Sequence, residues 1–336
     1  MKVAQIRKYN KKDINVIINE IEIPNILDNE VLVKVKTAGL NPLDNMITRG
    51  EVKLIVDYKM PLSMGNEFAG VVENTGSNVK SFKKGDKVYG RLPLDKIGAF
   101  AEYLVVDEDA IAKIPEYLTF VEASAVPLTA LTAMQALEIL NPEKGDSIFI
   151  SGGTGSFGAM AIPIAKSKGL YVITNGNGKN KEQVLNLGAD EFIDYKTEDY
   201  VNVLSDVDCV IDTLGGDELE KEFKILKNGG KLVSLKGMPN KRFAELNNMS
   251  FIKKVLFNFA GRKFDKLADK KNQEYHFIFV HSDGKQLEEV SKILSDIELH
   301  PLIDSVFKLD EINKGLEKID SGGSKGKTII EIDNTN

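Results

Sequence analysis

A glycine-rich segment, Ser151-Gly-Gly-Thr-Gly-Ser-Phe-Gly158, is the part of the sequence that points most directly to chemistry. It contains G-x-G-x-x-G between an apolar run and a stretch of helical periodicity. Glycines there permit a tight turn and close approach to a pyrophosphate, and the helix amino terminus supplies N–H donors. A plain tight turn is the alternative. We expect dinucleotide binding by the loop residues Gly153, Thr154, Gly155, Ser156, Phe157 and Gly158.

The segment Thr174-Asn-Gly-Asn-Gly-Lys-Asn-Lys181 indicates which dinucleotide binds. It follows the second predicted strand, where NAD-selective sites carry an acid that binds the ribose 2′-hydroxyl. Amides and lysines stand here instead, which favours NADPH because a carboxylate would repel its 2′-phosphate. We expect Asn175 in this site, Lys179 or Lys181 paired with the phosphate, and Tyr195 over the adenosine. The alternative is that the lysines only solvate a helix start.

Length and composition set the frame for this site. The 336 residues predict two packed domains, and 42% hydrophobic with 28% charged residues is typical of a globular protein. A net charge of −6 argues against nucleic acid as a partner. The single cysteine allows no internal disulfide, and the amino terminus lacks a secretory apolar run, so we expect the cytoplasm. No run of 18 apolar residues predicts membrane insertion.

The elements that must position the loop change in character near residue 147. Before it, short alternating apolar runs separated by turns predict antiparallel strands at residues 31–36, 70–73, 87–89 and 101–106. After it, short apolar strands alternate with helical stretches, which predicts a parallel, doubly wound α/β sheet. Its strands are expected at residues 147–151, 170–174, 191–194, 207–212, 231–235 and 275–280.

Short motifs follow one another in a fixed order along nearly the whole chain. They are Ala38-Gly-Leu-Asn-Pro-Leu-Asp44, Gly65-Asn-Glu-Phe-Ala-Gly-Val-Val72, Gly85-Asp-Lys-Val-Tyr-Gly90, Ala99-Phe-Ala-Glu-Tyr103, Pro127-Leu-Thr-Ala-Leu-Thr-Ala133, the glycine loop, Leu187-Gly-Ala-Asp190, Asp212-Thr-Leu-Gly-Gly216 and Gly326-Lys327. This order resembles the medium-chain dehydrogenases and reductases, in particular their zinc-free quinone oxidoreductase branch. The resemblance implies a Rossmann domain, residues 126–282, inserted in a GroES-like β-barrel catalytic domain, residues 1–125 plus 283–336, with the active site between them.

The departures from the zinc-containing relatives concern the metal ligands. Those relatives carry an early cysteine, a His-Glu pair and four cysteines in a structural loop, whereas this chain has Asn66-Glu67 at the pair and one cysteine, Cys209, far away. Zinc needs thiolate or imidazole ligands at close spacing, so we expect no metal site. Glu67 is expected to accept a hydrogen bond or pack near the cleft, and Asn66 to fix a turn.

Without a metal to polarise an alcohol, acceptors that already carry a polarised double bond are favoured. We expect reduction of a small apolar quinone or α,β-unsaturated carbonyl by hydride from NADPH. The resemblance places Thr132 against the nicotinamide, and Asn41 and Asp44 beside the ring and substrate. An ordinary Asn-Pro turn and a helix cap are the alternatives for Asn41 and Asp44. The resemblance also implies that Leu214, Leu235, Gly237, Phe277 and Phe279 contact the cofactor.

The remaining candidates carry weaker signals. Tyr58 lies where related enoyl reductases carry an active-site tyrosine, and we expect it to donate a proton to the α-carbon. The three histidines and Cys209 are expected to be structural. Residues 249–263 form a basic amphipathic segment, interpreted as a lid over the substrate rather than as a membrane contact.

Two other functions stay open. An enoyl-thioester reductase would use basic residues for a nucleotide-bearing thioester, and lysines near 253–271 allow this. A non-catalytic NADPH-binding sensor or structural protein would bind the cofactor without turnover. The resemblance also implies a homodimer.

Overall fold

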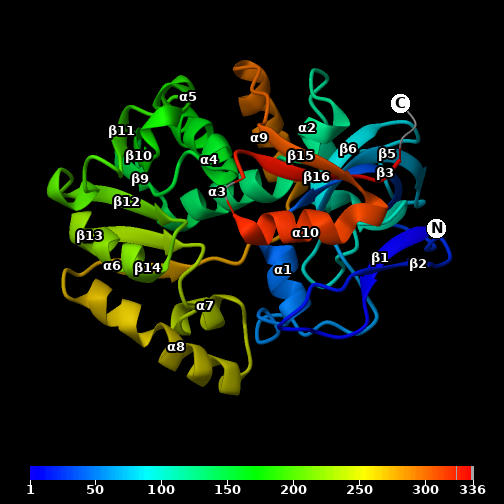
Figure 1. The fold of residues 1–336 in the computed structure, drawn as a ribbon, viewed down its shortest axis with the longest axis horizontal. Coiled ribbons are helices and arrows are strands. Elements are labelled where there is room, and N and C mark those ends of the chain that lie inside the picture. Colours follow the sequence, from blue (N-terminus) through cyan, green and yellow to red (C-terminus); the bar gives the residue numbers. More distant parts are fainter. Residues whose placement is uncertain (323, 334–336) are drawn as a thin grey trace. The chain divides into compact units, whose positions relative to one another are not determined.

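Two compact units make up the chain. A computed structural model describes residues 1–322 and 324–333. Unit 1 comprises Met1–Leu131 with His281–Asn336, and unit 2 comprises Thr132–Val280 (Figure 1). These bounds lie close to the predicted 1–125 plus 283–336 and 126–282.

Unit 1 is built on two β-sheets. The larger has the order β15-β16-β3-β5-β6-β8 with β7 also paired to β3, and the smaller has the order β2-β1-β4. The pairs are antiparallel except β15 with β16. The strands are β1 (Lys2–Ile6), β2 (Ile17–Glu20), β3 (Glu30–Leu40), β4 (Leu62–Ser63), β5 (Glu67–Thr75), β6 (Lys87–Arg91), β7 (Tyr103–Asp107), β8 (Ile111–Lys113), β15 (Ile303–Lys308) and β16 (Lys327–Glu331).

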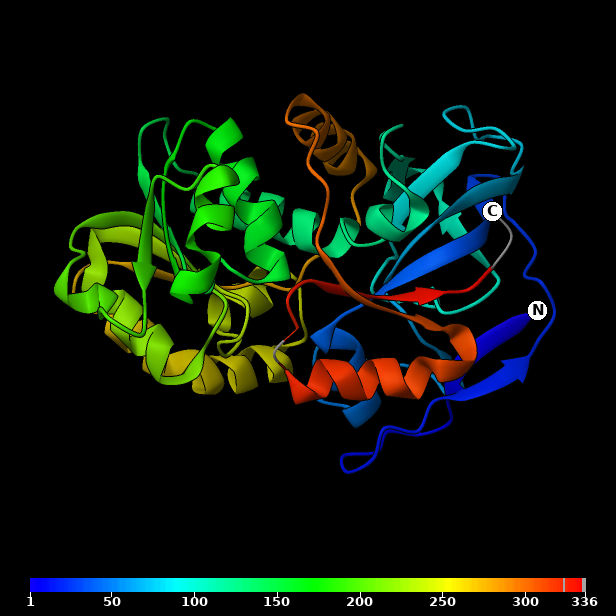
Figure 2. The ribbon, with the colours of Figure 1, turned by 45° about the horizontal axis from the view of Figure 1, so that its top comes forward.

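The carboxy-terminal segment returns to unit 1, as the resemblance implied. Strand β16, red in Figure 2, pairs with β3 from Thr328 opposite Leu40 to Glu331 opposite Thr37. The helices of this unit are α1 (Pro42–Arg49), α2 (Phe120–Ala123), α9 (Gly284–Asp296), α10 (Ile312–Ser321) and the first turn of α3 (Pro127–Leu140), with short 3-10 turns η1 (Glu108–Ala110) and η4 (Leu309–Glu311).

Helix α1 begins directly after β3, which fixes the position of its first turn. Pro42 occupies the first turn, where its missing N–H costs no hydrogen bond. Gly50 ends the helix in the left-handed region, with φ of 72°. The side chains of this first turn are therefore held at the end of a buried strand.

Unit 2 is a parallel sheet in the order β11-β10-β9-β12-β13-β14. Numbered from its own first strand this is 3-2-1-4-5-6, the order of dinucleotide-binding folds, and the predicted doubly wound α/β class is confirmed. The elements are β9 (Ser147–Ile150), α4 (Ser156–Ser167), β10 (Tyr171–Gly176), η2 (Gly178–Asn180), α5 (Lys181–Asn186), β11 (Glu191–Asp194), η3 (Tyr200–Asn202), β12 (Val207–Asp212), α6 (Gly216–Ile225), β13 (Leu226–Ser234), α7 (Lys241–Leu246), α8 (Phe251–Asp269) and β14 (Glu274–Phe277).

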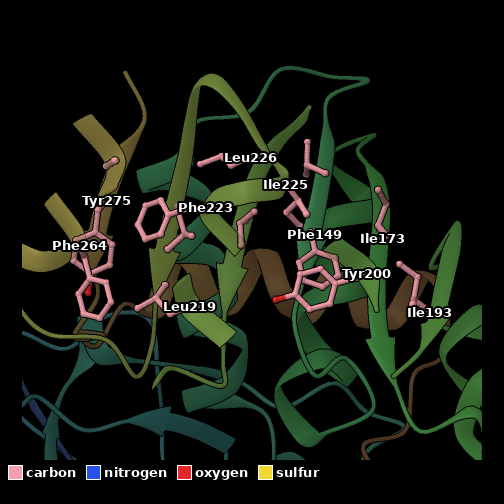
Figure 3. Close-up of a cluster of buried hydrophobic side chains, with 14 residues drawn as sticks. Phe149, Ile173, Ile193, Tyr200, Leu219, Phe223, Ile225, Leu226, Phe264 and Tyr275 are labelled. Atoms are coloured by element: carbon pink, nitrogen blue, oxygen red, sulfur yellow. The ribbon is translucent and has the colours of Figure 1, made fainter. Parts of the chain in front are cut away.

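A cluster of buried apolar side chains covers one face of this sheet (Figure 3). Phe149 on β9 stacks against Tyr200 with ring centroids 4.8 Å apart, and Phe264 on α8 packs on Tyr275 of β14 at 5.2 Å. Burial on this scale holds the sheet rigid, because removing each large apolar side chain from water stabilises the fold by about 1.5–3 kcal/mol. The carboxyl ends of the strands are thereby fixed in one row.

One stretch, Phe120–Leu140, is long and apolar enough to cross a membrane by length and composition. It spans α2 and α3, and 83% of its apolar 18-residue segment is buried inside the protein. A core helix passes the same test, so this stretch is weak support for a membrane span.

Candidate functional site

A buried ion pair lies at the centre of a polar cluster in unit 1. Lys327 at the start of β16 places its Nζ 2.7 Å from Oε1 of Glu67 on β5, and their side chains are 4% and 0% exposed. Nδ2 of Asn41 donates to the same Oε1 at 2.7 Å, and Lys327 Nζ donates to Asn41 Oδ1 at 2.6 Å. The backbone N–H of Leu128 donates to Glu67 Oε2 at 2.7 Å. Both charges are therefore compensated.

Gly39 on β3 makes room for the Glu67 carboxylate. The two residues stand opposite each other in the β3–β5 pair. A Cβ on Gly39 would overlap Glu67 Oε1 and would lie 2.5 Å from the backbone oxygen of Ser124. The absence of a side chain at residue 39 therefore lets the carboxylate lie against the sheet.

Asn41 and Asp44 hold the start of α1. The N–H of Asn41 donates to Asp44 Oδ2 at 2.8 Å, and Asn66 Nδ2 donates to Asp44 Oδ1 at 2.8 Å. Burial raises the pKa of Asp44 to about 7, while the hydrogen bonds from Asn41 and Asn66 oppose this effect and the charge of Glu67 adds to it. The helix-cap alternative for Asp44 is thus observed. Contact of Asn41 or Asp44 with a substrate stays a prediction.

Tyr58 and Arg91 are buried near this cluster with polar atoms left over. Tyr58 is 8% exposed and its Oη has no hydrogen-bond partner among the described residues. Arg91 at the end of β6 is 0% exposed; its Nη1 donates to the backbone oxygen of Leu92, while Nε and Nη2 have no partner there. Burial raises the pKa of Tyr58 to about 12 and lowers the pKa of Arg91 to about 10. Tyr58 is therefore a protonated phenol at neutral pH.

Two residues of this cluster were missed from the sequence. In the sequence Lys327 belongs only to the Gly326-Lys327 motif, and Arg91 directly follows the motif that ends at Gly90. A lysine close before the apolar pair Ile329-Ile330 of a short strand is the only signal that could have singled out Lys327. Arg91 carries no comparable signal, because exposed arginines at strand ends are common.

The glycine loop of unit 2 lies between β9 and α4, as predicted. The N–H of Gly153 donates to Thr174 Oγ1 at 3.1 Å, so the loop is bonded to the neighbouring strand β10. A Cβ on Gly153 would overlap Thr174 Oγ1, and one on Gly158 would overlap the backbone of Gly153. These glycines bring helix and strand together, and α4 begins after Gly155 with its first N–H groups facing the loop.

The loop stands at the point where a parallel sheet of this order reverses its winding. Strand β9 pairs with β10 on one side and with β12 on the other. Ligands of open α/β sheets bind outside the carboxyl ends of the strands at this position. The residues present therefore fit a dinucleotide, with close backbone approach at Gly153 and Gly155 and the α4 amino terminus for the pyrophosphate.

Asn175, expected at the cofactor, acts on the loop itself. Its Oδ1 accepts the N–H of Gly152 at 2.8 Å, and the residue is 4% exposed. Its side-chain oxygen is therefore engaged in shaping the loop. A direct contact between Asn175 and the cofactor stays a prediction.

The region expected to hold the adenosine carries both signs of charge. Lys179 and Lys181 are exposed after β10, and Tyr195 is 58% exposed after β11. No acid was found at the end of β10 in the sequence, yet the carboxylate of Asp194 from β11 lies against Gly178, where a Cβ would overlap Oδ2. Only the pairing of β10 with β11 brings Asp194 there.

The residues expected near the nicotinamide follow β12, β13 and β14. Leu214 is 44% exposed, and its N–H donates to Asp212 Oδ1 at 2.8 Å. The N–H of Leu235 donates to the backbone oxygen of Asp212, and that of Gly237 to Ser234 Oγ at 2.6 Å. Both N–H groups are therefore engaged inside the unit. A contact of Leu235, Gly237 or Leu214 with the cofactor stays a prediction.

The other expected residues lie as follows. Phe277 ends β14 with its ring edge-on to Phe243 at 5.1 Å, and Phe279 follows two residues later. Thr132 is buried on α3. Cys209 is buried on β12, and burial raises the pKa of its thiol to about 12. His276 is buried beside Arg242 and Glu274.

The amphipathic segment forms most of α8. Phe257 and Phe264 are buried, whereas Phe251 and Phe259 are 80% and 67% exposed. Its role as a lid stays a prediction.

Comparisons with known proteins agree with this architecture. Residues 27–116 match the alcohol dehydrogenase GroES-like domain and residues 187–330 match the zinc-binding dehydrogenase family. A 2-methylene-furan-3-one reductase of Solanum lycopersicum is 33% identical over 98% of this chain and 79% of its own length. An NADPH-dependent alkenal/one oxidoreductase of Arabidopsis thaliana, from the chloroplast, is 32% identical over 81% of this chain and 72% of its own.

A solved structure, the quinone oxidoreductase from Coxiella burnetii, superposes with a TM-score of 0.81 at 29% identity over 99% of both chains. The fold and the relatives define an oxidoreductase with a GroES-like domain and a Rossmann domain that uses a nicotinamide cofactor. The chain belongs to the medium-chain dehydrogenase and reductase superfamily, in its zinc-free quinone oxidoreductase-like branch.

Proposed function

We propose that this chain is an NADPH-dependent, zinc-independent oxidoreductase that reduces quinones or α,β-unsaturated carbonyl compounds by hydride transfer. The glycine loop at the reversal point of the 3-2-1-4-5-6 sheet is the observation that carries cofactor use. The reduction of quinones or α,β-unsaturated carbonyls is supported by the relatives, which act on methylene-furanones, alkenals or enones, and quinones according to their names.

The residues of unit 2 would hold the cofactor by backbone and charge. Gly153, Gly155 and the first turn of α4 would receive the pyrophosphate, because helix N–H groups there point outward. When bound, NADPH supplies a hydride to the substrate. Asp212 fixes the loop that carries Leu214, since its Oδ1 accepts the N–H groups of Leu214 and Gly215.

The residues of unit 1 would supply the proton and the polar frame. Tyr58 keeps its proton at neutral pH because burial raises its pKa, so its Oη is able to donate. Asn41 is engaged by Lys327 and Glu67 and acts as a positioning residue in this proposal. If Tyr58→Phe left turnover on an enone unchanged, its role as proton donor would be wrong.

Independence from zinc is supported by what surrounds Glu67. In the zinc-containing relatives this position belongs to the His-Glu pair, but here a lysine ammonium lies 2.7 Å from the carboxylate. A second cation at that carboxylate would be repelled by Lys327. Within the described residues no group of three His, Cys, Asp or Glu side chains could hold a metal ion. Activity that persists after chelation, with no stoichiometric zinc by elemental analysis, would agree with the proposal.

The preference for NADPH over NADH can be tested on three side chains. Lys179 and Lys181 would attract the 2′-phosphate, whereas Asp194 beside Gly178 would oppose it. We expect Lys179→Ala or Lys181→Ala to lower kcat/KM for NADPH and to leave that for NADH nearly unchanged. Asp194→Asn should raise kcat/KM for NADPH. If kcat/KM for NADPH equalled kcat/KM for NADH in the wild-type protein and in all variants, the NADPH proposal would be contradicted.

A panel of acceptors separates the proposed reductase from its alternatives. NADPH oxidation is followed with a naphthoquinone, an enone and crotonyl-CoA. Turnover of the first two supports the proposed function, whereas exclusive turnover of crotonyl-CoA supports an enoyl-thioester reductase. NADPH binding without consumption of any acceptor supports a sensor or structural protein.

Compartment and assembly are part of the same proposal. A cytoplasmic homodimer, with no nucleic-acid partner and no stable membrane insertion, stays the expectation from composition and family resemblance. Size-exclusion chromatography with light scattering would test the dimer.

A further inference from the structure

Arg91 is a buried cation beside the polar cluster, and two of its three guanidinium nitrogen atoms have no hydrogen-bond partner among the described residues. Glu67 stands opposite Arg91 in the β5–β6 pair, so the two side chains share one face of the sheet. However, the two oxygen atoms of Glu67 already bind Lys327, Asn41 and Leu128. Among the described residues, Arg91 Nε and Nη2 are buried without a partner.

Such an arrangement opposes folding. The carboxylates of Glu67 and Asp44 attract the guanidinium, but each buried N–H donor without a hydrogen-bond partner still carries a desolvation penalty. Tyr58 contributes another buried, unpartnered polar atom, its Oη, and the charge of Arg91 acts on it. Buried polar groups without a protein partner call for an explanation, and use by a ligand or in a reaction is one that the chemistry of these donors fits.

The chemistry of these groups defines what they would bind. Nε–H, Nη2–H and the Tyr58 O–H are all donors, and the guanidinium carries positive charge. Their complement is an oxygen atom that carries, or gains, negative charge. A neutral carbonyl oxygen gains most from such donors when it becomes an enolate or a quinolate, that is, during the reaction.

We propose that Arg91 is a catalytic residue that binds the carbonyl oxygen of the substrate and stabilises the negative charge that forms there. This inference rests on the proposed function. When the β-carbon of an enone receives the hydride, the enone is reduced, NADPH is oxidised to NADP⁺, and the π electron pair moves to the oxygen beside Arg91. The O–H bond of Tyr58 then breaks, a C–H bond forms at the α-carbon, and the carbonyl is restored. Water returns a proton to the Tyr58 phenolate.

Two variants and one control test the role in turnover. Arg91→Gln removes the charge and Arg91→Lys keeps it without the planar fork of donors. Lys87→Gln, at an exposed position on the same strand, is the control. We expect Arg91→Gln to lower kcat on an enone by about 100- to 1,000-fold, as for loss of an oxyanion donor, with NADPH affinity unchanged. The kcat of Arg91→Lys should lie between those of Arg91→Gln and the wild type, and the kcat of Lys87→Gln should equal that of the wild type.

A binding assay without cofactor gives a second readout. The probe is 4-nitrophenol, whose phenolate oxygen stands in for the enolate oxygen and whose ionisation is visible by absorbance. We expect the wild-type protein to bind the phenolate and to shift its ionisation to lower pH. Arg91→Gln should weaken phenolate binding by at least about tenfold, which corresponds to one lost charged contact.

Thermal unfolding separates this role from a structural one. A structural Arg91 predicts a lower Tm in Arg91→Gln, whereas a cation held for the substrate predicts an equal or higher Tm. If Arg91→Gln does not fold, the same turnover, phenolate-binding and unfolding measurements are made on Arg91→Lys.

The outcomes distinguish this inference from the proposed function. Suppose that the protein consumes NADPH with none of the acceptors but binds the phenolate, and that this binding depends on Arg91. This outcome would refute the proposed function and support the anion site at Arg91. Normal turnover in Arg91→Gln, or the absence of Arg91-dependent phenolate binding in the wild type, would overturn the role of Arg91.

Discussion

Replacing Asp44 by Asn should make the protein more stable at alkaline pH. Asp44 is 0% exposed and accepts hydrogen bonds from the Asn41 N–H and from Asn66 Nδ2. Asparagine at residue 44 keeps the first bond through its Oδ1. Its Nδ2 can donate to Asn66 Oδ1, which has no partner among the described residues, once the Asn66 amide turns over.

The sign of the effect follows from linkage between protonation and folding. Burial raises the pKa of Asp44 from 3.8 to about 7, so the folded state holds this proton more tightly than the unfolded state. The corresponding stability is fully present below the unfolded value and is lost as pH rises from about 4 through about 7. The folded and unfolded pKa values of Asp44 differ by about three units, which corresponds to a total loss of about 4 kcal/mol of folding stability as the pH rises. About 3 kcal/mol of this loss falls between pH 5 and pH 8.

Urea unfolding at pH 5 and pH 8 measures this effect. Far-UV circular dichroism is the suitable signal, because the chain has no tryptophan. The free energy of unfolding of Asp44→Asn minus that of the wild type should grow by about 3 kcal/mol between the two pH values. Asp57→Asn, an exposed carboxyl outside the cluster, is the control. A difference that stays constant within ~1 kcal/mol would refute the reasoning.

Three further predictions concern other buried groups. Lys327→Met should lower the free energy of unfolding by about 3–5 kcal/mol, measured in urea, because the buried Glu67 carboxylate loses its ion-pair partner; adding Glu67→Gln should recover part of the loss. Gly158→Ala should weaken NADPH binding by more than about tenfold in a fluorescence titration, since its Cβ would overlap Gly153 and displace the loop. Cys209 should resist a thiol reagent in the native protein and react after unfolding, because it is 4% exposed with a pKa raised to about 12.

The parts of the fold that sequence predicted well are those fixed by local pattern. Residues 147–151 and 207–212 are short, mostly apolar runs and form β9 and β12, because strands buried on both faces are mostly apolar along their length. The short strands β1 and β2 were not predicted. β2 shows no clear alternation, with three of its residues only partly buried and the last exposed.

The candidate site also has a part that local sequence predicts and a part that depends on how the strands pair. The glycine loop is contiguous in sequence, and each glycine has a local reason, so the chain alone determined a dinucleotide fold and pointed to a nicotinamide reductase. The position of Asp194 against Gly178 could not be read in that way, because it depends on which strand lies beside β10.

Only the tertiary structure decided the polar cluster. Lys327 and Asn41 are 286 positions apart, and they meet because β16 pairs with β3. Whether Arg91 is a solvated surface residue, or a buried cation with donors that find no partner among the described residues, depends on the side chains packed around it, which no local pattern records. Burial changes the free energy of a charge by several kcal/mol, and burial is a property of the folded neighbourhood rather than of the residue.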